Sequence, residues 1–228
     1  MNRALRKRIR GALFDVDGTL IDSVDQHASA WRDAFREFGK RVTKKQVRSQ
    51  VGKGSDQFLP VFLTREEIER FGKELVERRG KVYLKRYFPT VRPFPKVKEL
   101  LRTIRAAGVR VVLASSAEES ELKKYVKLAG IGDLIESYTS SEDAQKSKPH
   151  PDIFQAALKK LGKLRKSEVV VVGDSPFDAQ GATRAGLKSI GFLSGGFTRA
   201  QLRRAGVCEI YRDPADLLKK FDRSLLAK

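Results

Sequence analysis

Cysteines, long apolar runs and targeting signals are scarce or missing from this sequence, and each absence excludes a class of protein. The 228-residue chain has a single cysteine, Cys208, which excludes an internal disulfide and a cysteine-based metal cluster. No apolar run approaches the length of a membrane span, so we expect no membrane partner. The basic stretch 3–10 lacks the hydrophobic segment of a secretory signal. We therefore expect a cytoplasmic protein.

Signatures of nucleic-acid-binding proteins are also missing, although the formal charge is +19. We find no zinc-finger spacing, no basic-zipper heptads and no aromatic RNA-binding signature. Lys and Arg are spread along the whole chain. We interpret them as a solvated basic surface that also attracts anionic substrates, and we expect no dedicated nucleic-acid partner. A non-catalytic protein that binds anions or nucleic acid stays open as the alternative from another class.

Strand patterns are missing between residues 22 and 90, which splits the chain into two parts. Hydrophobic residues make up 40% and charged residues 33% of the chain, as in globular proteins. Apolar periodicity and capping residues predict helices over 23–38 and 43–50 and a helical stretch over 64–88. The proline-rich stretch 89–95 predicts a linker that leaves this helical block.

From residue 96 on, helices and strands alternate, which predicts a doubly wound parallel α/β sheet. The predicted strands are 10–15, 109–114, 168–172 and 187–192, with short segments near 135–138 and 208–211, and the predicted helices are 96–107, 118–129, 151–161, 176–185, 198–205 and one from Pro214. We expect strand 10–15 to be central, between 109–114 and 168–172. Residues 1–22 and 92–228 would form the core, and 23–90 an inserted all-helical cap domain.

The stretch from Gly11 to Leu20 carries two carboxylates directly after a buried strand. Because residues i and i+2 of a strand face the same way, we expect Asp15 and Asp17 to share one small volume. Two carboxylates so close repel each other unless a divalent cation or a shared proton intervenes. The alternative is an ordinary strand followed by an Asp-Gly turn at Gly18.

Polar residues also follow later strands of the predicted sheet. Ser115 and Ser116 end one strand, where they could bind an anion or cap the next helix. Lys148 lies in a proline-flanked loop, which would hold its charge in a fixed place. Asp174 ends another strand, and Asp178 lies in the first turn of the following helix, where it could also serve the helix dipole.

These four stretches of sequence, in this order, resemble the four motifs of the haloacid dehalogenase superfamily. Asp-Val-Asp-Gly-Thr-Leu resembles the nucleophile motif, the terminal serine the second motif, Lys-Pro-His-Pro the third and Gly-Asp-Ser-Pro-Phe-Asp the fourth. The helical insertion resembles the cap of the subgroup that holds phosphoglycolate phosphatases and β-phosphoglucomutases. The resemblance implies a Rossmann-like core with an inserted helical cap.

The resemblance also implies a metal cofactor, Mg²⁺. Its protein ligands would be the Asp15 carboxylate, the Asp17 backbone carbonyl and the Asp174 carboxylate. Asp178 would orient Asp174 or a bound water. Such oxygen ligands suit Mg²⁺, and the cation removes the repulsion between carboxylates and a phosphate monoester.

The implied chemistry gives each motif residue a catalytic role. Asp15 would attack phosphorus and form an aspartyl-phosphate, and Asp17 would act as general acid and then general base. Ser115, together with Ser116, and Lys148 would hold the phosphoryl oxygens. Dehalogenase relatives lack an acid at the position of Asp17, so this residue favours phosphoryl chemistry.

We therefore predict a Mg²⁺-dependent phosphatase that acts on small phosphate monoesters, such as phosphoglycolate or sugar phosphates, with a small phosphorylated metabolite as its partner. In the cap, the loop 52–56 could close over the site, and its Lys53 is a candidate substrate contact. His27 matches a histidine of β-phosphoglucomutases, which keeps a phosphosugar mutase open as the alternative. Ser55 replaces the substrate-binding arginine of those mutases, which weakens the alternative. The oligomeric state is not predicted.

Overall fold

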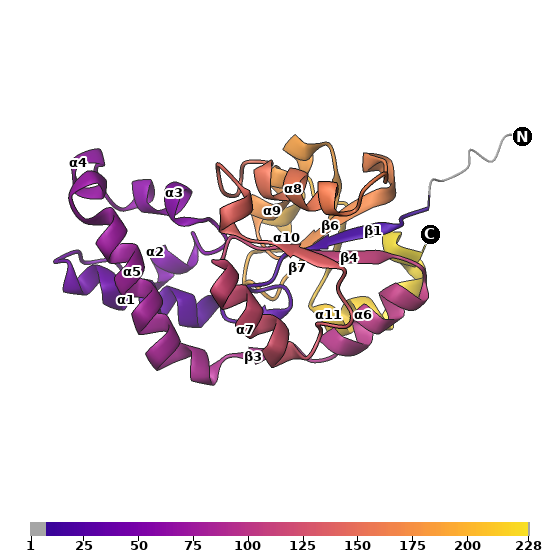
Figure 1. The fold of residues 1–228 in the computed structure, drawn as a ribbon, viewed down its shortest axis with the longest axis horizontal. Coiled ribbons are helices and arrows are strands. Elements are labelled where there is room, and N and C mark those ends of the chain that lie inside the picture. The colour runs from indigo at the N-terminus through magenta and orange to yellow at the C-terminus, as the bar shows by residue number, and fades with distance from the viewer. Residues whose placement is uncertain (1–7, 228) are drawn as a thin grey trace, which may run out of the picture.

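A parallel sheet of six strands lies at the centre of the computed structural model, which describes residues 8–227. The order of strands is β5-β4-β1-β6-β7-β8 (Figure 1). Their bounds are β1 Gly11–Phe14, β4 Arg110–Ala114, β5 Ser137–Thr139, β6 Val169–Gly173, β7 Lys188–Phe192 and β8 Glu209–Tyr211. The basic residues predicted to precede the first strand lie largely outside the described residues, because 1–7 are not among them.

The central strands are apolar along their whole length because both faces of the sheet are covered. All residues of β1 and β6 are buried, as expected for parallel strands that carry helices on both sides. Phe14 pairs with Leu113 of β4 and with Val172 of β6. Strand β1 is therefore central, as predicted, and Asp15 leaves it at the carboxyl edge of the sheet.

Two layers of helices cover the sheet (Figure 1). On one face, α6, α7 and α11 contribute to the larger hydrophobic core, which includes Leu101, Leu122 and Leu217. On the other face, α8 and α9 pack through Phe154 and Ala182. The bounds of the helices in this part are α6 Val97–Ala106, α7 Glu119–Ala129, α8 Asp152–Lys160, α9 Pro176–Ala185, α10 Arg199–Arg204 and α11 Pro214–Lys219. The predicted doubly wound sheet is confirmed.

A separate group of helices lies beyond the carboxyl edge, at the left of Figure 1. Trp31, Phe35 and Phe58 belong to a hydrophobic core that these helices share. The bounds are α1 Val24–Glu37, α2 Lys44–Arg48, α3 Ser55–Phe58, α4 Arg65–Glu67 and α5 Lys73–Val82, with π-helical turns at Ile68–Gly72 and Tyr83–Tyr87. This is the expected inserted all-helical cap.

The chain crosses between cap and core on a short two-stranded ribbon. Strands β2 (Ile21–Asp22) and β3 (Arg92–Pro93) pair antiparallel. The crossings therefore lie side by side, which is the arrangement that a hinge needs. We propose the division into a core of 1–22 and 92–228 and a cap of 23–90 on this basis.

The predicted cap loop 52–56 is shorter than expected. Ser55 and Asp56 already belong to α3, whose N-terminal cap is Gly54. A capping box of Thr64 and Glu67 stands at the start of α4, where the sequence predicts a helical stretch to begin. None of the helices within residues 8–227 has the length and apolarity needed to cross a membrane.

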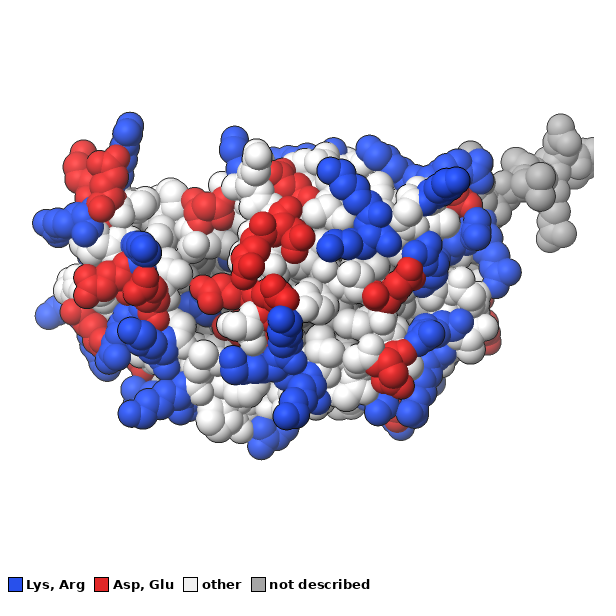
Figure 2. Space-filling view, in the orientation of Figure 1, with Lys and Arg blue, Asp and Glu red and all other residues white. Residues whose placement is uncertain are grey.

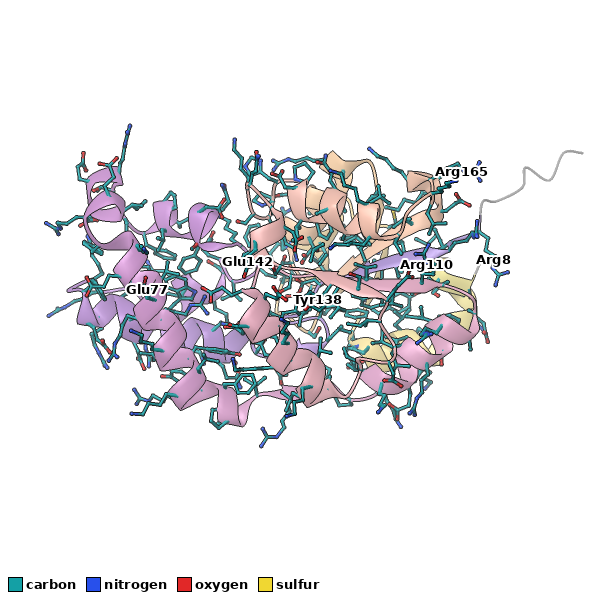
Figure 3. The ribbon with its side chains drawn as sticks, in the orientation of Figure 1. Arg8, Glu77, Arg110, Tyr138, Glu142 and Arg165 are labelled. Atoms are coloured by element: carbon teal, nitrogen blue, oxygen red, sulfur yellow. The ribbon has the colours of Figure 1, made fainter. Side chains whose placement is uncertain are left out.

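Basic side chains are abundant at the end of the molecule away from the cap (Figures 2 and 3). Arg8, Arg110 and Arg165 lie there, near the amino ends of the strands. Arg110 forms an ion pair with Glu136. These three arginines are thus remote from the carboxyl edge, where the predicted site residues lie.

Candidate active site

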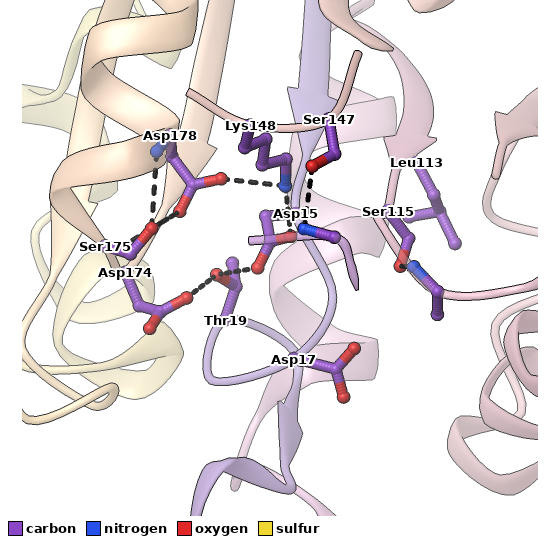
Figure 4. A network of polar contacts seen from close by, with 12 residues as sticks. Asp15, Asp17, Thr19, Leu113, Ser115, Ser147, Lys148, Asp174, Ser175 and Asp178 are labelled. Atoms are coloured by element: carbon purple, nitrogen blue, oxygen red, sulfur yellow. Dashed lines mark hydrogen bonds and ion pairs between the residues drawn. The ribbon is translucent and has the colours of Figure 1, made fainter. Parts of the chain in front are cut away.

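Asp15 and Asp17 leave the sheet edge together but face different partners (Figure 4). Strand β1 ends at Phe14, so the strict alternation of a strand no longer applies to the two residues. The turn at Gly18 has a φ of 81°, a left-handed conformation that glycine adopts without strain. Asp15 joins a cluster with Lys148, whereas the carboxyl group of Asp17 turns to His27. Both residues line the same cavity, as expected for a shared volume. The correction is that their carboxyl groups contact different partners.

Lys148 lies at the centre of the first cluster and is completely buried. Its Nζ lies 2.5 Å from Asp15 Oδ1 and 2.8 Å from Asp178 Oδ1. Burial alone would lower the pKa of Lys148, but the two carboxylates raise it above its usual value. The lysine therefore carries a fixed positive charge next to Asp15, as predicted from its proline-flanked loop.

Asp15, Asp174 and Asp178 form a buried acidic cluster in which ligand oxygens lie within 4.8 Å of one another. Burial raises the pKa of Asp15 to about 7, although Lys148 acts in the opposite direction. Burial, followed by the charge of Asp15, raises the pKa of Asp174 well above its usual value. Three carboxylates thus share the charge of Lys148, and a divalent cation would allow them to ionise together.

Two glycines allow the Asp174 carboxylate to lie close against the backbone. A Cβ atom at Gly195 would lie 1.7 Å from Asp174 Oδ2, and one at Gly18 would lie 2.5 Å from the same oxygen. Thr19 Oγ1 holds the other oxygen, Asp174 Oδ1, at 2.9 Å and lies 3.0 Å from Asp15 Oδ2. The carboxylates are therefore pre-positioned, and the acidic oxygens suit a hard cation such as Mg²⁺. No sequence pattern indicated a role for Gly195, which lies in a loop after β7.

Asp178 takes the helix-start role that the sequence allowed and also contacts Lys148, which the sequence did not predict. Its Oδ2 accepts hydrogen bonds from the Ser175 amide at 3.1 Å and from the Ser175 hydroxyl at 2.6 Å, which completes a capping box at the start of α9. Its Oδ1 pairs with Lys148. Asp178 therefore ties the lysine to the rigid first turn of a helix.

The serines that follow β4 do not cap the next helix. Glu118 occupies the N-cap position of α7 without a side-chain cap. The Ser115 hydroxyl accepts a hydrogen bond from the Ala117 amide at 3.1 Å, which leaves its own proton free to donate. The Ser116 hydroxyl oxygen is buried and has no hydrogen-bond partner among the described residues. Ser116 lines the same cavity as Asp15, so it can meet an anion there.

A second polar network surrounds the Asp17 carboxylate. Its Oδ1 accepts a hydrogen bond of 2.5 Å from the Ser23 hydroxyl and lies 2.8 Å from His27 Nε2. Ser23 is the N-cap residue of α1, but its side chain makes no capping bond because it turns to Asp17. Although burial acts to raise it, the pKa of Asp17 is lowered, chiefly by His27.

Two tyrosines complete this network, and no sequence pattern indicated a role for either. The Tyr125 hydroxyl of α7 lies 3.0 Å from His27 Nε2 and also contacts the Tyr83 hydroxyl. The ring of Tyr83 stacks on His27 with centroids 4.1 Å apart and an angle of 8°. The cap thus holds His27 from one side and the core from the other.

Lys53 lies in the cap loop over the cavity, but its contacts are local. Its Nζ donates a 2.6 Å hydrogen bond to Gln50 and lies 4.8 Å from the ring centroid of Phe177. Beside it, the Gly54 amide donates to the Ser147 hydroxyl at 2.9 Å, and the Ser147 amide donates to Asp56 at 3.0 Å. These bonds hold the cap loop against the residue that precedes Lys148.

The chain matches the family model of haloacid dehalogenase-like hydrolases over residues 12–192. This match spans most of the chain and all four motifs. The chain therefore belongs to the haloacid dehalogenase-like hydrolase family, and the expectation of an enzyme of this superfamily is confirmed.

Individual relatives agree with this assignment. The chain is 32% identical to a phosphoglycolate phosphatase of Pectobacterium atrosepticum over 192 residues, which are 82% of the chain and 81% of that protein. It is 32% identical over 190 residues to the protein SUPPRESSOR OF QUENCHING 1, chloroplastic, of Arabidopsis thaliana, and this match spans 80% of the chain but 18% of that longer protein. The crystal structure of a hydrolase from Pseudomonas syringae has a TM-score of 0.85 at 30% identity and covers 94% of this chain and 98% of its own.

Proposed function

We propose that this protein is a Mg²⁺-dependent phosphatase of small phosphate monoesters that works through an aspartyl-phosphate on Asp15. The observation that carries the proposal is the position of Asp15. Its carboxylate lines a cavity of about 290 Å³ and is held by the buried Lys148 at the same time. A carboxylate that is fixed in direction and open to a cavity can attack a bound phosphorus in line.

The phosphoryl group would bind between Asp15 and the residues that follow β4. Ser116 offers a buried hydroxyl that has no partner within residues 8–227, and Ser115 retains a free proton. Lys148 supplies the positive charge that opposes the charge spread over the phosphoryl oxygens during transfer. The site is thus assembled before substrate arrives, which lowers the cost of reorganisation in the transition state.

Asp17 would move the protons. Because His27 lowers its pKa, Asp17 is ionised in the arrangement seen. An approaching phosphate monoester adds negative charge, which favours the protonated form. Protonated Asp17 would then give its proton to the leaving oxygen, and the ionised form would take a proton from the water that attacks the aspartyl-phosphate.

Mg²⁺ would be held by Asp15 and Asp174, with Asp178 close by. The Asp17 backbone carbonyl is an expected further ligand. When bound, the cation supplies a Lewis acid that neutralises phosphoryl charge.

Protein freed of metal with EDTA is expected to lose p-nitrophenyl phosphate hydrolysis, and added Mg²⁺ should restore it. Release of p-nitrophenolate is followed by absorbance. Undiminished hydrolysis in EDTA would contradict the proposed cofactor, and no hydrolysis under any condition would contradict the phosphatase itself.

We expect Tyr125 to position His27 rather than to take part in the reaction. Tyr125→Phe removes the hydroxyl that lies between His27 and Tyr83 but keeps the buried ring. The variant should lose roughly tenfold in kcat on an alkyl phosphate, about the worth of one buried hydrogen bond. The loss should be smaller with p-nitrophenyl phosphate, since its leaving group needs little protonation. Equal losses on both substrates would show that Tyr125 has only a structural role.

A further inference from the structure

The cavity beyond Asp15 extends between cap and core and has walls of opposite character. Trp31 and Phe58 of the cap form an apolar wall, with ring centroids 4.4 Å apart. Arg79 of α5 and Glu121 of α7 face the cavity from cap and core. The leaving group of a phosphate ester bound at Asp15 would occupy this space, so these walls would determine which alcohol is accepted.

The charge of the lining is negative. Apart from Asp15, four acidic residues line the cavity, namely Asp17, Asp56, Glu118 and Glu121, against the cations Lys53 and Arg79. Counting His27 as a third cation does not reverse the balance. Figure 2 shows acidic side chains gathered across the middle of the face, where cap and core meet, and Glu142 lies there in Figure 3. A leaving group with its own carboxylate would meet like charge on entering.

The positive side chains of the lining already have partners. Arg79 Nη1 lies 3.5 Å from Glu121 Oε2, and both side chains are largely buried. Lys53 turns to Gln50 and to the ring of Phe177. A second anionic group on the substrate would therefore have to displace an existing contact, which reduces the benefit of binding it.

Arg79 nevertheless has a donor to offer a neutral ligand. Its guanidinium lies over Trp31, with Cζ 5.0 Å from the ring centroid, and its Nε is buried without a hydrogen-bond partner among the described residues. A buried donor without a partner is costly, and because Arg79 lines the cavity, its side chain gains by turning this donor to a ligand hydroxyl. Glu121 beside it can accept a hydrogen bond from a neighbouring hydroxyl. A donor, an acceptor and an aromatic face together suit an alcohol that carries several hydroxyl groups.

The size of the cavity agrees with such a ligand. Its volume of about 290 Å³ is close to the lower limit of ~300–1,000 Å³ that is usual for small-molecule sites. A two-carbon glycolate would leave much of this volume empty.

We infer that the leaving-group site of this protein takes a neutral, polyhydroxylated alcohol of sugar size, bound by Arg79 and Glu121 over Trp31, in preference to glycolate. The inference rests on the proposed phosphatase function and names its class of substrate. It departs from the phosphoglycolate that gives the Pectobacterium relative its name.

The test compares kcat/KM for phosphoglycolate with kcat/KM for sorbitol 6-phosphate and ribose 5-phosphate. We expect the polyol and sugar esters to be favoured at least tenfold. Turnover of p-nitrophenyl phosphate together with a preference for phosphoglycolate would overturn this inference and leave the phosphatase proposal standing. No turnover of any ester would overturn the phosphatase proposal and the inference with it.

Variants of Arg79 and Glu121 separate the contributions of these two residues to substrate preference. Arg79→Met should lower kcat/KM for sorbitol 6-phosphate about tenfold, and acetyl phosphate, whose leaving group carries no hydroxyl, should lose less. Glu121→Gln should lower the ratio of kcat/KM for sorbitol 6-phosphate to kcat/KM for phosphoglycolate severalfold, because it removes one charge that repels the glycolate carboxylate. Arg78→Met is the matched control, since the neighbouring Arg78 pairs with Glu37 away from this cavity. If the ratio of kcat/KM for sorbitol 6-phosphate to kcat/KM for phosphoglycolate stays unchanged in both Arg79→Met and Glu121→Gln, the inference is overturned.

Discussion

Replacing Asp15 with asparagine is expected to abolish turnover of every phosphate ester. The amide keeps the size of the side chain but removes the nucleophilic charge. Phosphate release from p-nitrophenyl phosphate and from an alkyl phosphate measures the effect. The loss should reach the detection limit with both, because the nucleophile is needed whatever the leaving group.

A matched control distinguishes lost chemistry from lost structure. Asp22→Asn changes an exposed aspartate of β2 in the same way and should keep full activity. Circular dichroism should show that the Asp15→Asn protein is folded, because Lys148 retains Asp178 as its partner. Substantial activity in Asp15→Asn would contradict covalent catalysis at this residue.

Asp17→Asn should lower the rate on an alkyl phosphate by roughly 10²–10⁴-fold, the usual contribution of general acid–base catalysis. The asparagine carbonyl can still accept hydrogen bonds from Ser23 and His27, and the backbone carbonyl expected to bind Mg²⁺ is unchanged. Mg²⁺ affinity should therefore be similar to that of the unmodified protein.

The size of this loss should depend on the leaving group. p-Nitrophenolate leaves without protonation, so the variant should keep a larger share of its activity on p-nitrophenyl phosphate. Equal damage on both substrates in a variant that still binds Mg²⁺ would show that Asp17 is not the leaving-group acid.

The sequence predicted those parts of the site that lie at the ends of short apolar runs. Asp15, Ser115 and Asp174 each follow a buried strand closely, and parallel strands bring their carboxyl ends to one edge. Lys148 was predicted from its rigid loop and its place in the order of motifs. The structure brings Asp15, Lys148 and Asp174 together as expected.

The remaining contacts depend on packing between segments far apart in the chain. Tyr83 and Tyr125 meet across 42 residues, in the cap and in the core, and each has the apolar spacing of an ordinary helix residue. Gly195 lies in a loop and matters only because Asp174 approaches it. Sequence patterns predict which face of an element is buried, but not which polar atoms meet once two elements pack.

The central claim, an aspartyl-phosphate on Asp15, is tested most directly by trapping it. The protein is mixed with Mg²⁺ and acetyl phosphate, quenched during turnover and treated with borohydride, which reduces an acyl phosphate to an alcohol. Mass spectrometry of the peptide that contains Asp15 should show homoserine at position 15, and none when acetyl phosphate is omitted. Steady phosphate release from the same sample without any homoserine at position 15 would contradict the account.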